Sequence, residues 1–170
     1  MGYTHYWSFK NIPKGKTEQV EKLYQQAIKD IQKIAKVYNS YFESGDDRRL
    51  SGYTAYSNKY GGVKINGSGD NAHEDFYLSQ YYKQNRLNNS GGFCKTAYKP
   101  YDLVVTAALS VLKYRLGDLI VVGSDGQAED WKLGVEFASK VLRRKIRCPL
   151  VEYTKPTKLQ FSEALNEKLS

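Results

Sequence analysis

The sequence predicts an α+β domain in which an antiparallel sheet carries its helices on one face. Apolar residues recur at strand spacing and then at helix spacing, giving the expected order strand, helix, strand, strand, helix, strand, helix. The first six elements match the ferredoxin-like (βαββαβ) arrangement, and the seventh adds a C-terminal helix. In that arrangement the first strand and the strand at 74–79 would be the two central strands.

The first two elements are the most regular part of the sequence. Residues 2–10 are rich in aromatic and β-branched side chains, which is typical of a strand, and period two places Tyr3, His5 and Trp7 on one face. Thr17 is expected to cap a helix whose apolar residues continue at helical spacing as far as Tyr38.

Short segments separated by glycine turns follow this helix. Residues 43–50 are expected to form a loop, and 80–92 a polar excursion that ends in glycine. The short strands expected between these two segments are 52–57, 63–66 and 73–78.

The chain is organised around a polar segment, Gly91–Asp102, that leads into an apolar run. Pro100 fits the first turn of a helix over about 100–115, and Gly117 fits its end. The apolar residues of this run share helical spacing, which predicts that one face of the helix is buried.

The last predicted elements follow in short order. Leu119–Val122 is a continuous apolar run, as expected of a buried strand, and Gly123–Gly126 is expected to form a turn before a third helix that begins near Ala128. We expect residues 1–148 to form one domain. Residues 149–170 would be an appendix packed on it, with a short strand at 150–153 and helical turns after Ser162.

Composition limits the class of partner. The chain has 170 residues, a net charge of +8 and 15 tyrosines, so anionic partners are favoured: a nucleotide, a nucleic acid or an acidic protein surface. No apolar run approaches the roughly 18 residues of a membrane helix, and the first residues lack the pattern of a signal peptide, so we expect a cytoplasmic protein. Homo-oligomerisation is left open.

The cysteines and histidines do not follow a metal-ligand pattern. Cys94 and Cys148 are expected to be free thiols, and no spacing typical of a zinc site occurs, so neither a metal nor another cofactor is expected. A cysteine nucleophile at Cys94 would need a neighbouring base such as His5 or His73, and it is a minor alternative.

The start of the second predicted helix has the character of a phosphate site. Lys95, Thr96 and Lys99 crowd this start, where unpaired N–H groups and the helix dipole favour an anion. The alternative is a glycine-rich loop that enters a core helix with solvated lysines. No complete phosphate-loop motif is present to decide between them.

Two further clusters could carry polar chemistry. The chain has two histidines, His5 and His73, and both fall on predicted strands, where they could share one cleft or simply be hydrogen-bonded within the sheet. Ser124 and Asp125 follow a buried strand, where they could line a site or cap the next helix.

Several short motifs together resemble a family of small uncharacterised proteins found in phages and bacterial genomes. The resemblance covers about residues 2–135 and implies no particular reaction, but a phage setting implies counter-defence, for example sequestration of a host signalling nucleotide. Ala97-Tyr98 stands where the family often has basic residues. The motifs are Gly2-Tyr3-Thr4-His5-Tyr6-Trp7, His73-Glu74-x-Phe76, Phe93-Cys94-Lys95-Thr96, Lys99-Pro100-Tyr101-Asp102, Ser124-Asp125-Gly126 and Asp130-Trp131.

The leading hypothesis is therefore a protein that binds a small anionic, nucleotide-like ligand, with lysines on phosphate and aromatic rings on a base. An alternative is a phosphoester or nucleotide hydrolase that uses His5 and His73, and a further one is an inhibitor that binds nucleic acid or a host nuclease. For the leading hypothesis the expected ligand-binding residues are Tyr3, His5, Trp7, His73, Lys95, Thr96, Lys99, Tyr101, Ser124 and Asp125.

Overall fold

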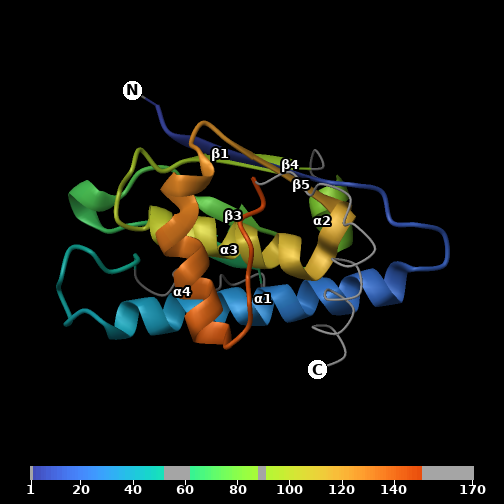
Figure 1. Ribbon diagram of the computed structural model, residues 1–170, viewed down its shortest axis with the longest axis horizontal. Helices are drawn as coiled ribbons and strands as arrows, with labels where there is room; N and C mark the ends of the chain where they lie inside the picture. Colours follow the sequence, from blue (N-terminus) through green and yellow to red (C-terminus); the bar gives the residue numbers. More distant parts are fainter. Residues whose placement is uncertain (1, 52–61, 88–90, 151–170) are drawn as a thin grey trace, which may run out of the picture.

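The computed structural model describes residues 2–51, 62–87 and 91–150, and these form a mixed α+β structure with an antiparallel sheet (Figure 1). The strands are β1 (Thr4–Phe9), β2 (Val63–Ile65), β3 (Phe76–Leu78), β4 (Gly91–Lys95) and β5 (Ile120–Ser124). The α-helices are α1 (Thr17–Ser40), α2 (Tyr82–Leu87), α3 (Asp102–Leu116) and α4 (Lys132–Leu142), and short 3₁₀ turns lie at Gly69–Asn71, Gly117–Leu119 and Ala128–Trp131.

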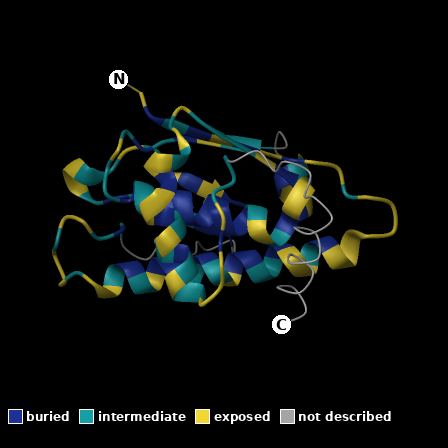
Figure 2. Cartoon of the chain, in the orientation of Figure 1, coloured by how far each residue is buried: buried dark blue, intermediate teal, exposed yellow. Residues whose placement is uncertain are grey.

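The central strand of the larger sheet is β1, which lies between β4 and β5 and is antiparallel to both. In the register, His5 lies opposite Cys94 on one side and Ser124 on the other. Burial alternates along the strand, because Trp7 and Phe9 face the helices while the other row faces away (Figure 2). The helices therefore cover one face of this sheet, as the sequence predicts.

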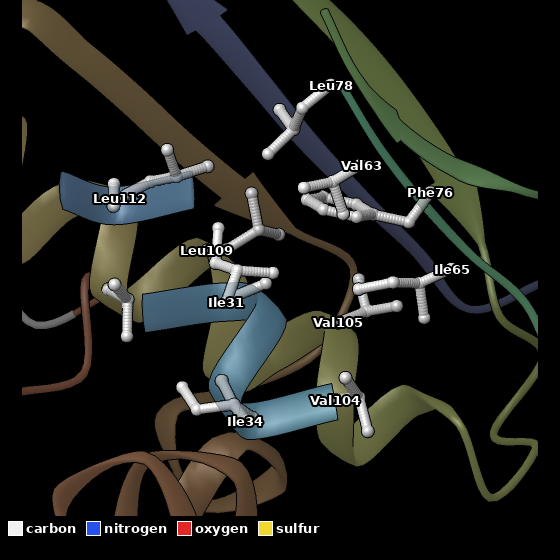
Figure 3. Packing of buried hydrophobic residues seen from close by; sticks show 14 of the residues in the cluster. Ile31, Ile34, Val63, Ile65, Phe76, Leu78, Val104, Val105, Leu109 and Leu112 are labelled. Atoms are coloured by element: carbon white, nitrogen blue, oxygen red, sulfur yellow. The ribbon is translucent and has the colours of Figure 1, made fainter. Parts of the chain in front are cut away.

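The strand expected at 73–78 does not occupy a central place. Its strand residues, Phe76–Leu78, pair with Val63–Ile65 in a separate two-stranded hairpin, and β4 takes the place beside β1. Figure 3 shows the apolar side chains of this hairpin directed at α1 and α3. The hairpin is thus held by core packing, an interaction between distant segments that strand propensity does not encode.

Helix α3 is buried on every side rather than on one face, so the one-faced expectation for this helix is wrong. Every residue of Val104–Leu112 is buried, because α1, α4 and the sheet enclose the helix (Figure 2). Each fully buried Val or Leu side chain contributes roughly 1.5–3 kcal/mol relative to exposure. The helix is accordingly apolar around its circumference, as expected of a core helix.

Some predicted boundaries shift. Lys16, rather than Thr17, is the N-cap of α1, and Pro100 lies in the turn before α3. Helix α2 lies inside the predicted excursion, held by a hydrogen bond from Tyr82 Oη to the carbonyl of Lys10. The predicted strands at 52–57 and 150–153 and the helical turns after 162 lie wholly or mostly outside the described residues. None of the described helices is long and apolar enough to cross a bilayer.

Candidate functional site

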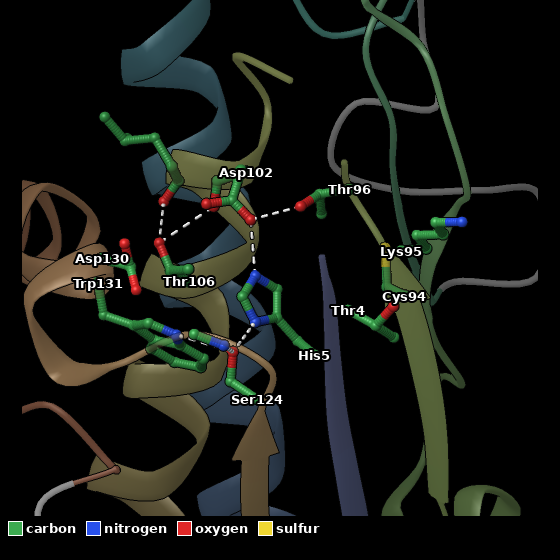
Figure 4. Close-up of polar contacts among 12 residues, drawn as sticks. Thr4, His5, Cys94, Lys95, Thr96, Asp102, Thr106, Ser124, Asp130 and Trp131 are labelled. Atoms are coloured by element: carbon green, nitrogen blue, oxygen red, sulfur yellow. Dashed lines mark hydrogen bonds and ion pairs between the residues drawn. The ribbon is translucent and has the colours of Figure 1, made fainter. Parts of the chain in front are cut away.

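His5 is the centre of a buried polar network on the helix-facing side of β1. Its side chain is 0% exposed, and both ring nitrogens have partners: Nε2 lies 2.6 Å from Asp102 Oδ1, and Nδ1 lies 2.9 Å from Ser124 Oγ (Figure 4). Asp102 begins α3 and Ser124 ends β5, so one side chain of the central strand connects two other elements.

Asp102 occupies the start of α3. Its Oδ1 also accepts a hydrogen bond of 2.6 Å from the Thr96 hydroxyl, and its own N–H donates to the carbonyl of Lys99. The N–H groups that follow, those of residues 103–105, donate to the carbonyls of Pro100 and Tyr101. The helix start therefore already holds a carboxylate, and its N–H groups are hydrogen-bonded. The Thr96 hydroxyl, which the sequence predicts to bind phosphate, is bonded to that carboxylate instead.

The hydrogen bonds of Ser124 indicate which ring nitrogen of His5 carries the proton. Ser124 Oγ accepts from the backbone N–H of Gly126 at 3.0 Å and from Trp131 Nε1–H at 3.3 Å, which uses both of its lone pairs. The serine proton is then free to be donated to His5 Nδ1, and Nε2–H of the histidine donates to Asp102. We assign His5 as a neutral imidazole with its proton on Nε2 from this count of donors and acceptors.

This Ser–His–Asp chain has the composition of a hydrolytic triad, but its environment favours a positioning role. A serine nucleophile needs a lone pair directed at substrate, whereas both lone pairs of Ser124 accept N–H bonds. The imidazole of His5 is also enclosed by the edges of two rings, Tyr3 at 4.8 Å and Trp131 at 4.9 Å between centroids. The network therefore joins β1, α3 and β5 through satisfied hydrogen bonds.

Tyr3 and Tyr98 form a stacked pair above this network. Their ring centroids are 3.8 Å apart at an interplanar angle of 17°, and Tyr98 is 64% exposed whereas Tyr3 is buried. Ala97 and Tyr98 have φ angles of 50° and 59°, the left-handed region that side chains rarely adopt. A strained backbone thus holds an exposed aromatic ring over a buried one.

The buried hydroxyl of Tyr3 has no hydrogen-bond partner among the described residues. It lies near Ser124 Oγ, which lowers its pKa, but the two oxygens do not reach hydrogen-bonding geometry. Burial has the larger effect and, with the charges of Asp102 and Asp130, raises the pKa of Tyr3 far above its usual value. An unsatisfied buried hydroxyl costs about 1–3 kcal/mol, so this group is suited to receive a ligand atom.

The other predicted residues have different surroundings. Trp7 packs in the core against Phe76, 5.0 Å between ring centroids, and the buried Tyr101 donates to the Glu74 carbonyl at 2.7 Å. His73 is exposed before β3 and is held through its backbone by Asn66. The structure therefore does not bring His5 and His73 into one hydrogen-bonded group.

The remaining predicted polar residues, Lys95, Lys99 and Asp125, lie in different positions relative to the His5 network. Lys95 points away from the His5 network (Figure 4), whereas Lys99 is half-buried in the loop that carries Tyr98. Asp125 lies beside the network and accepts hydrogen bonds from the N–H of Thr4 at 3.1 Å and the hydroxyl of Tyr6 at 3.2 Å.

Cys94 is not placed as a nucleophile. Its side chain is buried, and burial raises the pKa of its thiol to about 12. Within the described ranges, no group of three or more histidine, cysteine, aspartate and glutamate side chains is arranged to hold a metal ion.

Sequence reasoning assigned no role to Asp102 or Tyr98, although both lie in motifs that it singled out. Asp102 reads as an ordinary first-turn acid. The signal at Tyr98 was its position directly after Ala97 in a polar loop, but the left-handed backbone that exposes the ring has no sequence signature here. Comparison of the chain with family models, curated proteins and solved structures finds no match.

Proposed function

We propose that this protein binds a small anionic, nucleotide-like ligand at the Tyr3–Tyr98 pair and does not cleave it. The observation that carries this proposal is the unpartnered, buried hydroxyl of Tyr3 beneath the exposed ring of Tyr98. A flat ring can stack on Tyr98 or take its place, and a polar edge of that ring can then pair with the Tyr3 hydroxyl.

The charges around the pair support a ligand that is not uniformly anionic. Asp130, whose charge acts on the Tyr3 hydroxyl, can accept a hydrogen bond from the amino group of a base, while Lys99 offers a cation to phosphate from the Tyr98 loop. This differs from a phosphate held by the N–H groups of α3, because those groups donate to loop carbonyls.

Binding is favoured over hydrolysis by the environment of His5. Both of its nitrogens are engaged, and His73, the second histidine of the hydrolase alternative, is exposed before β3. The family resemblance extends the proposal to a phage protein that sequesters a host signalling nucleotide. We also infer a ferredoxin-like relation from the order β4-β1-β5 and the helices between these strands.

Calorimetric titration of the full chain with ATP, ADP-ribose and a cyclic dinucleotide tests the proposal, with mass spectrometry of the ligand afterwards. We expect at least one to bind with a defined stoichiometry and to be recovered with unchanged mass. Tyr98→Gly, which removes the ring and suits the left-handed backbone, should weaken binding at least tenfold.

The control is Tyr41→Ala, because Tyr41 is 63% exposed but follows α1. Lys99→Ala should weaken binding of the phosphorylated ligand more than binding of the matching nucleoside. Absence of binding across the panel would refute the proposed function, equal binding by Tyr98→Gly would refute the site, and a changed ligand mass would indicate hydrolysis.

A further inference from the structure

The β4-β1-β5 sheet has one face opposite the helices (Figure 1), here called the outer face, and its residues are exposed or partly exposed. Strand alternation defines its members, because His5, Trp7 and Cys94 face inward. The outer face comprises Thr4, Tyr6, Ser8 and the following Lys10, with Gly91, Phe93 and Lys95 of β4 and Val121 and Gly123 of β5.

Two aromatic rings stand next to each other on this face. Tyr6 and Phe93 are register partners on neighbouring strands, and they are 45% and 64% exposed. Val121, at 49% exposure, adds apolar surface nearby. Directly opposite partners lie close enough for their side chains to form one surface, and a continuous exposed apolar surface of this kind marks an interaction site.

The surface beside the rings is open. Gly123 lies opposite Tyr6 on the other side of β1, and a Cβ atom placed on it would meet nothing within 4 Å. The hydroxyl of Tyr6 is bonded to Asp125, which restrains its position at one edge of the face. The rings are therefore accessible from the side of β5.

Cations lie at both ends of the outer face. Lys95 is opposite Thr4, and Lys10 continues the outward row beyond the other end of β1. Lys10 lies six positions after Thr4, which corresponds to roughly 20 Å along a strand. With a chain net charge of +8, this arrangement complements an extended anion with flat apolar groups between its charges.

We propose that the outer face binds single-stranded nucleic acid, with bases stacked on Tyr6 and Phe93 and phosphates at Lys10 and Lys95. Aromatic side chains on adjacent strands of an antiparallel sheet are the arrangement by which sheet-type RNA-binding domains stack bases. A duplex keeps its bases stacked internally and cannot use these rings. The site is distinct from the Tyr3–Tyr98 pair, because its rings lie on the opposite side of β1.

Fluorescence anisotropy with labelled 12-nucleotide single strands of RNA and DNA, and a duplex of the same length, tests this proposal on the full chain. We expect the single strands to bind more tightly than the duplex. Phe93→Ala should weaken binding by about tenfold, the effect of losing one stacked base. Removing Lys10 and Lys95 together should reduce the slope of log K against log salt by about 1.4.

Two further variants separate loss of the surface from loss of the fold. Gly123→Leu fills open space at an ordinary backbone position, so it should fold normally and weaken binding, whereas Tyr41→Ala should bind as the wild type. Circular dichroism and thermal melting confirm folding in each case. Lack of single-strand binding at 50 mM salt, preference for duplex, or full binding by both Phe93→Ala and Gly123→Leu would each overturn the proposal. Retention of nucleotide binding by Phe93→Ala distinguishes this site from the Tyr3–Tyr98 pair.

Discussion

His5 stabilises the fold by satisfying two polar groups that belong to other elements. Its removal would take one hydrogen bond from the carboxylate of Asp102 and the acceptor from the hydroxyl proton of Ser124, both in a largely buried setting. A partner left unpaired in such a setting costs more than the net value of the hydrogen bond itself. At the residue scale, the network therefore holds β1, α3 and β5 together beneath the candidate site.

We predict that His5→Ala lowers the free energy of unfolding by about 3 kcal/mol, because it removes one hydrogen bond to a buried carboxylate and leaves a buried hydroxyl proton without an acceptor. His73→Ala is the matched control, because His73 is exposed, and it should change stability by less than about 0.5 kcal/mol. Urea denaturation followed by circular dichroism measures both values. Similar midpoints for the two variants would contradict the structural role of His5.

The sequence singled out some members of this network, but not the contacts that join them. His5 stood out as one of two histidines, both on predicted strands, and Ser124 and Asp125 stood out because they follow a predicted buried strand. The connection to Asp102 could not be predicted, because it depends on a contact between residues 97 positions apart in the chain. Spacing within a motif carries information on local contacts only.

At the element scale, the packing of β4 against β1 depends on a glycine. A Cβ atom on Gly92 would lie 2.7 Å from Trp7 Cζ2, a distance that requires the indole to move. Trp7 is itself packed in the core against Phe76, so little room is available for that movement. The approach of these two strands therefore requires the absence of a side chain at this position.

We predict that Gly92→Ala destabilises the protein by about 1–3 kcal/mol, as overpacking of a core does. Gly123→Ala on β5 is the matched control, because its Cβ would meet nothing within 4 Å, and it should be neutral or slightly stabilising. Urea midpoints give the energies, and the near-ultraviolet circular dichroism of Trp7 reports the indole. A neutral Gly92→Ala would show that β4 approaches β1 less closely.

Long elements with a clear period were predicted, and short ones held by distant contacts were not. The apolar spacing of α1 reflects its burial against the core, so its position follows from sequence. Strand β4 reads as a loop because it begins with two glycines, which are required by the neighbouring strand rather than by a turn. Helix α2 was missed because its bonds run to Lys10 and Glu21.

At the scale of the whole molecule, the class of fold was predictable and the pairing of strands was not. Alternating strand and helix periods indicate an α+β domain, and the structure confirms an antiparallel sheet with helices on one face. The order β4-β1-β5 depends on which segments meet across the chain. The core contains buried tyrosines from several elements, and burial of their hydroxyls makes the stability of the fold sensitive to high pH.

We predict that stability falls steeply above pH 10. Burial raises the pKa of Tyr38 from 10 to about 12, so the unfolded chain loses this proton at a lower pH than the folded one. Between these values the unfolded state binds fewer protons, and the free energy of unfolding therefore decreases as pH rises. Other tyrosines whose pKa is raised by burial are Tyr3, Tyr24, Tyr82 and Tyr101.

Tyr38→Phe isolates one contribution to this loss. At pH 8 the variant should be about 1 kcal/mol less stable, because it lacks the hydrogen bond from the tyrosine hydroxyl to the Arg48 carbonyl. Its decline between pH 10 and 12 should be smaller than that of the wild type by about 2–3 kcal/mol, since one titrating group is gone. Urea unfolding at several pH values measures the difference, with the exposed Tyr41→Phe as control. Equal declines for wild type and Tyr38→Phe would mean that the Tyr38 phenol ionises as easily in the folded chain as in the unfolded chain.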